Sequence, residues 1–223
     1  MPHESGQTLG AAARRPRLRG VSHLWALVAA IPVGVLLCLH AHSTLQRASA
    51  IAFAAAVTAM FGTSALYHRV IWQPRVRAWM RRLDHAMIYT LIAGTYTPFG
   101  LLVLQGAWRY TILSIVWTGA FAAVVLKLLW VDAPKWVGAG IGIGLGWVAV
   151  IAFPQIVGRI GATGATLLLL GGLAYTAGAI VYARRRPDPV PTVFGYHEVF
   201  HALVIVAVAL QYATIAFYVL PDS

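Results

Sequence analysis

The sequence predicts an all-α protein, a bundle of seven transmembrane helices with a cytoplasmic N-terminus and an extracytoplasmic C-terminus. Three observations predict it: a composition rich in hydrophobic residues, seven apolar stretches of membrane-spanning length, and an uneven distribution of basic residues between the loops. Hydrophobic residues make up 60% of the 223 residues and charged residues only 10%, whereas a soluble domain carries about 25% charged residues. This composition suits a bilayer better than water.

The apolar stretches divide the chain into segments of roughly 20 residues, the length that crosses a bilayer as a helix. Prolines, glycines and runs of arginine separate them, and these residues are typical of turns and loops. The predicted spans are 21–42, 47–68, 83–104, 109–130, 136–156, 162–183 and 196–219. We therefore expect a disordered basic cytoplasmic tail over residues 1–20 and a seven-transmembrane domain over residues 21–220.

The orientation follows from the basic residues that flank the spans. Of the 17 lysines and arginines, 14 lie in the N-terminal tail or in loops on its side, and only Arg47, Arg109 and Arg159 lie on the other side. Cytoplasmic loops carry this excess, so the N-terminus is expected inside and the protein in the cell inner (plasma) membrane. The net charge of +11 then serves orientation and contact with anionic lipid, and we expect no nucleic-acid partner.

The predicted fifth span contains a glycine at every second position from Gly138 to Gly146. Glycines four residues apart match the small-xxx-small pattern by which transmembrane helices approach each other closely. We therefore expect this span to pack tightly against a neighbouring helix.

A few ionisable residues lie within the predicted spans, where they are candidates for function because a charge in lipid is costly. The predicted topology places His68 at the cytoplasmic end of the second span and Asp84 at the cytoplasmic start of the third. His197 and His201 lie in the first turns of the seventh span, which also starts inside. Residues from three separate helices therefore share one depth in the membrane.

This group has the chemistry of a metal site. His197 and His201 share one helix face, a spacing that lets two imidazoles bind one metal ion. His68 can supply a third nitrogen, and three histidines plus a water are a usual catalytic zinc site, in which the metal lowers the pKa of the water to about 7. Asp84 could accept a hydrogen bond from that water or from a ligand histidine. Ser64, one turn before His68, could contact the substrate or a developing oxyanion.

The other histidines are not expected to be ligands; they are His3, His23, His40, His42 and His85. One motif offers a different interpretation of the site. Residues 197–201 match H-E-x-x-H, in which Glu198 would be the general base of a metalloprotease. We favour the three-histidine site because His68 is already available at the matching depth.

Four segments carry a resemblance to a known family. They are SALYH at 64–68, RLDHAMIY at 82–89, GTYTP at 94–98 and GYHEVFH at 195–201. Together they resemble the bacterial hemolysin III family of the progestin and adipoQ receptor superfamily, which includes the adiponectin receptors, over about residues 20 to 220. The resemblance implies zinc held by His68, His197 and His201, with Asp84 orienting the metal-bound water.

We therefore expect Zn²⁺ as the cofactor of a metal-dependent hydrolase that cleaves a lipid amide or ester. Asp84 would be the general base, and Ser64 would polarise the scissile carbonyl. Two alternatives stay open, in which zinc is structural: a pore-forming or cytolytic protein, as the hemolysin name implies, and a membrane sensor. The expected partner is membrane lipid, as substrate or as annular lipid, and the sequence leaves a homo-oligomer open.

Overall fold

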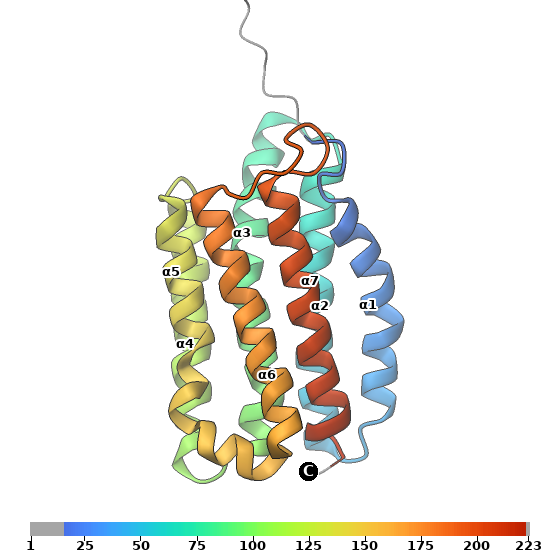
Figure 1. The fold of residues 1–223 in the computed structure, drawn as a ribbon, viewed down its shortest axis with the longest axis vertical. Coiled ribbons are helices and arrows are strands. Elements are labelled where there is room, and N and C mark those ends of the chain that lie inside the picture. The colour runs from blue at the N-terminus through green and yellow to red at the C-terminus, as the bar shows by residue number, and fades with distance from the viewer. Residues whose placement is uncertain (1–15, 222–223) are drawn as a thin grey trace, which may run out of the picture.

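The computed structural model describes residues 16–221 of the chain, which form a bundle of long helices joined by short loops (Figure 1). Residues 1–15 of the predicted tail lie outside the described residues. The α-helices are α1 (Val21–Leu39), α2 (Thr44–Arg69), α3 (Pro74–Pro98), α4 (Ala107–Leu129), α5 (Lys135–Gly146), α6 (Phe153–Arg184) and α7 (Tyr196–Thr214). Three shorter helical segments extend or connect them: η1 (Phe99–Val103), η2 (Val148–Ala152) and η3 (Ile215–Val219). The all-α prediction is therefore confirmed.

Six helical stretches in the described part of the chain are long and apolar enough to cross a membrane. Five of them contain α1, α2, α3 with η1, α4, and α7 with η3, and the sixth is a stretch of 50 residues that contains α5, η2 and α6. In Figure 1 the chain descends through α5, turns at the lower end of the bundle and ascends again through α6. Large apolar side chains are exposed on the outer faces, for example Trp25, Phe121 and Leu129, as expected where helices face lipid.

The connection between the fifth and sixth predicted spans contains the predicted break and an earlier one. A break was expected near residues 158–161, and Gly161 interrupts α6 there with a φ of 70°, a conformation that glycine adopts without steric cost. The predicted end of the fifth span at residue 156 is wrong, because α5 already ends at Gly146 and the next α-helix begins at Phe153. Residues 147–153 are all apolar, so hydropathy carries no signal for the earlier helix end.

The prediction of tight glycine packing is wrong for most of α5. A Cβ atom added at Gly138 would lie 3.1 Å from Lys127 Nζ, but one added at Gly140, Gly144 or Gly146 would meet nothing within 4 Å. Gly146 instead lines an internal cavity. Gly138 and Gly142 also line this cavity, whereas Gly140 and Gly144 are exposed, so most glycines of this helix do not bring backbones together.

Helix ends are set by local sequence, and they bring the polar residues to one end of the bundle. Ser43 and Gln46 form a capping box at the start of α2, with Gln46 N donating to Ser43 Oγ over 3.1 Å. Pro74 opens α3, where a missing backbone N–H has no cost.

The end of α2 and the starts of α1, α3 and α7 all lie at the upper end in Figure 1. Helix α3 is the most buried of the candidate spans and packs between α2 and α4.

Candidate metal centre and internal cavity

Three histidines from two helices meet at the upper end of the bundle. His68 lies in the last turn of α2, and His197 and His201 lie in the first two turns of α7. One ring nitrogen from each lies within 4.8 Å of the other two, and the Nε2 atoms of His68 and His197 are 3.2 Å apart. Two nitrogens bound to one tetrahedral zinc ion are about 3.3 Å apart. The three side chains are therefore placed so that they could hold one metal ion.

His201 has a further property that fits metal binding. Its side chain is 1% exposed, and its Nδ1 atom has no hydrogen-bond partner among the described residues. A buried polar atom without a partner costs free energy unless something else binds it. A set of imidazole donors suits zinc, and also iron, copper and nickel. The donor set thus fits the expected cofactor.

Asp84 and Ser64 border the three histidines, as the shared depth predicted. The Oδ2 atom of Asp84 is 3.8 Å from His68 Nε2. Ser64 is buried one turn before His68, and its side chain also lies close to the Asp84 carboxyl group. All five residues predicted for the site are therefore brought together: Ser64, His68, Asp84, His197 and His201. The catalytic and metal-binding roles assigned to them stay predictions.

His23 is a member of this cluster that the sequence interpretation missed. Its ring stacks on the ring of His201, with centroids 3.7 Å apart and an interplanar angle of 10°. Its Nδ1 atom forms a 2.8 Å hydrogen bond with Ser64 Oγ. The signal was present in the sequence, because the first span also begins in the cytoplasm and His23 lies in its first turn. Its depth should therefore have grouped it with the other histidines.

The other described histidines lie outside the three-histidine group, and His3 lies outside the described residues. His40 and His42 are exposed between α1 and α2, at the opposite end of the bundle. His85 lies one residue after Asp84 and lines the cavity, where its Nε2 is 3.4 Å from the hydroxyl of Tyr182.

Glu198 has structural partners on both carboxylate oxygens. Its Oε1 atom is 2.7 Å from Arg19 Nε, and its Oε2 atom accepts a 2.9 Å hydrogen bond from Gly195 N at the start of α7. The side chain is 1% exposed and does not line the cavity. A general base must reach a water beside the substrate. This geometry favours a role in helix capping and ion pairing over the H-E-x-x-H protease interpretation.

An internal cavity of about 220 Å³ adjoins the histidines. Its lining begins at Asp84 and extends past the end of α3 to Phe99, which corresponds to about 22 Å at 1.5 Å per helical residue. Most of the lining side chains are aliphatic or aromatic; examples are Met60, Leu91, Ile92, Phe99, Ile112 and Ile156. The cavity can therefore hold an elongated apolar group with one end at the histidine cluster.

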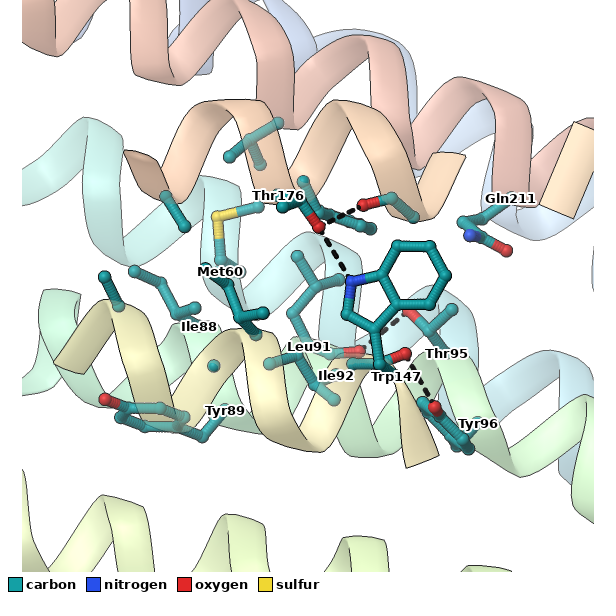
Figure 2. A pocket seen from close by; sticks show the side chains of 18 of the residues that line it. Met60, Ile88, Tyr89, Leu91, Ile92, Thr95, Tyr96, Trp147, Thr176 and Gln211 are labelled. Atoms are coloured by element: carbon teal, nitrogen blue, oxygen red, sulfur yellow. Dashed lines mark hydrogen bonds between the residues drawn. The ribbon is translucent and has the colours of Figure 1, made fainter. Parts of the chain in front are cut away.

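Figure 2 shows the middle of this cavity, where the indole of Trp147 projects between the helices. Trp147 Nε1 donates a 2.9 Å hydrogen bond to Thr176 Oγ1 on α6. The hydroxyl of Tyr96 donates to Gly146 O over 2.8 Å and accepts from Ala149 N over 2.9 Å. These bonds fix the segment between α5 and η2 and satisfy backbone groups where the helix breaks. These polar groups are thus paired with one another, and the apolar part of the cavity lining remains available to a ligand.

A comparison with protein families gives one match over most of the chain. The family described as "Haemolysin-III related" matches residues 11–212. This protein belongs to the haemolysin-III family. Two relatives agree with the assignment. The protein "Hemolysin-3" of Bacillus cereus is 32% identical over 206 residues, which cover 91% of each chain. The "Hemolysin-3 homolog" of Bacillus subtilis (strain 168) is 29% identical over 201 residues, which cover 89% of this chain and 91% of the relative.

Family membership and the helices support the same general conclusion. This haemolysin-III family protein contains several apolar helices of spanning length, so it is a multi-pass membrane protein. The residues that carried the resemblance in the sequence include the five that meet at the candidate metal centre.

Proposed function

We propose that this protein is a zinc-dependent hydrolase of the cell inner (plasma) membrane that cleaves an amide or ester of a long-chain lipid. The proposal includes seven membrane spans, with α5 and α6 as separate crossings, a cytoplasmic N-terminus and an extracytoplasmic C-terminus. The distribution of basic residues supports this orientation. The reversal of the chain between α5 and α6 in Figure 1 supports the seventh crossing.

One observation carries the proposal: three histidines that could hold a metal ion lie beside a buried carboxyl group at one end of a long apolar cavity. A structural zinc site is normally closed by four protein ligands, whereas a catalytic site keeps an open position. Only three histidine nitrogens converge among the described residues. A water-soluble substrate would have no need of an apolar cavity inside a membrane bundle.

Each residue has a proposed part in the reaction. His68, His197 and His201 would hold zinc, which supplies a Lewis acid and an acidified water when it is bound. Asp84 would take the proton of the attacking water. Ser64, held by its hydrogen bond with His23, would hydrogen-bond the oxygen of the scissile carbonyl as negative charge develops there. The apolar cavity would bind the acyl chain and exclude bulk water.

The metal is tested first, by elemental mass spectrometry of the detergent-purified protein. We expect about one zinc ion per chain in the wild type and none in His197→Ala/His201→Ala. A matched control is His40→Ala/His42→Ala, which removes two histidines at the opposite, exposed end and should keep the zinc. Folded wild-type protein that contains no metal after purification without chelator would contradict the proposal.

The reaction is tested next on a panel of lipid amides and esters. The name of the relatives offers a competing function, lysis of membranes, and a liposome leakage assay with the same variants separates the two. Turnover that is lost with the zinc supports the hydrolase. Leakage that persists in His197→Ala/His201→Ala, with no turnover of any lipid in the panel, would favour a cytolytic protein. A ligand-dependent conformational change without turnover would favour a sensor.

A further inference from the structure

Lys127 is a buried cation that faces the cavity. It lies in the last turn of α4, is 6% exposed and contributes to the cavity lining together with Asp84 and Tyr89. It has no hydrogen bond and no carboxylate within 4.0 Å in the part of the chain that the structure describes. An unpaired ammonium group inside a membrane protein is costly, and such residues commonly face a ligand path.

The neighbouring cations at this end of the bundle have partners. Arg81 pairs with Asp132 over 2.7 Å. Lys135 Nζ donates a 2.6 Å hydrogen bond to the hydroxyl of Tyr196 and lies 4.4 Å from the ring centroid of Tyr182. Neither of these two side chains lines the cavity. Lys127 differs from them because it has no such partner among the described residues and because it lines the cavity.

Gly138 makes room for the Lys127 side chain. A Cβ atom at position 138 would lie 3.1 Å from both Cε and Nζ of Lys127, and 3.3 Å from the hydroxyl of Tyr89. That hydroxyl donates to Gly138 O over 3.2 Å. The ammonium group thus packs on the backbone of α5 at the wall of the cavity. Asp84, the carboxyl group among the described residues that line the cavity, has His68 as its ionic neighbour instead.

We infer that the cavity binds a lipid with an anionic headgroup, and that Lys127 pairs with this headgroup. The headgroup is a carboxylate or a phosphate on a single aliphatic chain, and the chain extends along the apolar lining toward Phe99. This inference rests on the proposed function, which it deepens by naming the class of lipid. A charge-assisted hydrogen bond in a site of low dielectric would select this class over a neutral lipid of equal length.

The test is equilibrium binding of three radiolabelled probes to the detergent-purified full chain: palmitate, hexadecyl phosphate and hexadecanol. We expect wild-type protein to bind at least one of the two anions about tenfold more tightly than the alcohol. Lys127→Met should lose this preference while hexadecanol binding stays unchanged, and Lys127→Arg should keep it. The two anions distinguish a fatty acid from a phosphate-bearing lipid as the source of the headgroup.

Two further variants control the test. Lys135→Met removes a cation that already has partners and does not itself line the cavity, and it should bind the probes as wild type does. Gly138→Ala keeps the charge of Lys127 but displaces its ammonium group, so it should weaken binding of the anions and not of the alcohol. If Lys127→Met does not fold, Gly138→Ala takes its place in the binding test.

The binding test is independent of the metal. Headgroup preference that survives chelation and the His197→Ala/His201→Ala change supports Lys127 even if the hydrolase proposal fails. Preference that is lost in the histidine variant but kept in Lys127→Met overturns the inference, because the anion is then held at the histidines. Equal binding of all three probes, or no binding of either anion by wild-type protein, also overturns it.

Discussion

His23 and His201 lie face to face, with ring centroids 3.7 Å apart and planes within 10° of parallel. This contact joins the start of α1 to the start of α7. The same His23 ring is hydrogen-bonded to Ser64 on α2. The His23 side chain therefore orients both a candidate metal ligand, His201, and the candidate oxyanion donor, Ser64. His23 itself is proposed neither as a metal ligand nor as a catalytic residue.

We predict that His23 positions Ser64 more than it holds the metal. His23→Phe keeps a flat ring against His201 but removes the nitrogen that bonds Ser64. It should retain zinc and lower the rate of lipid hydrolysis about 10- to 100-fold, as typical for a partner outside the ligand set. His23→Gln, which keeps a hydrogen-bonding group, should recover part of the rate. Loss of zinc in His23→Phe would instead make the ring itself essential to the metal site.

Asp84 is expected to act on the reaction and not on folding. Asp84→Asn keeps the shape of the side chain but cannot take a proton, so the rate should fall by roughly 10²- to 10⁴-fold. Zinc content and thermal stability should change little. The control is Asp132→Asn, which removes an exposed carboxylate that pairs with Arg81. Full activity in Asp84→Asn would remove Asp84 from the mechanism.

Glu198 is expected to contribute to stability. Glu198→Gln can still accept the hydrogen bond from Gly195 N but loses the charge opposite Arg19. We expect unfolding to become easier by about 1–3 kcal/mol, the cost of an unsatisfied buried group. Zinc content and activity per folded molecule should persist. The H-E-x-x-H interpretation predicts the reverse, a stable protein without activity, and thermal unfolding with a parallel rate measurement separates them.

A second substitution, at Arg19, tests whether the ion pair between Arg19 and Glu198 causes the loss of stability in Glu198→Gln. In an Arg19→Met background, Glu198→Gln should cost clearly less than it does in the wild type, because the ion pair is already absent. Equal costs in both backgrounds would mean that the ion pair contributes nothing measurable.

Gly20 is expected to be required for the position of His68. Its φ is 76°, and a Cβ atom there would collide with the Cβ atom of His68. Gly20→Ala should cost about 1–2 kcal/mol for the backbone conformation and should also weaken zinc retention by displacing a ligand. Gly106→Ala is the matched control, because Gly106 has a φ of 56° but nothing within 4 Å. It should lower stability without loss of zinc during dialysis against a weak chelator.

Hydropathy and charge predicted much of the architecture. An apolar run of about 20 residues has few stable alternatives in a bilayer, because every backbone group must be satisfied inside the segment. The all-α class and the shared depth of His68, Asp84, His197 and His201 followed from this constraint. The same reasoning did not locate the early end of α5 at Gly146, because an apolar sequence continues across that break.

The sequence by itself determined which residue types lie at which depth, since span length and basic loops are one-dimensional properties. Only the tertiary structure decided which side chains face one another at that depth. The rotation of α1 about its axis brings His23 onto His201. The partners of Glu198, and the lack of a partner for Lys127 among the described residues, depend on packing between helices distant in sequence. Such contacts arise from how helix surfaces fit together, which periodicity in a single helix does not encode.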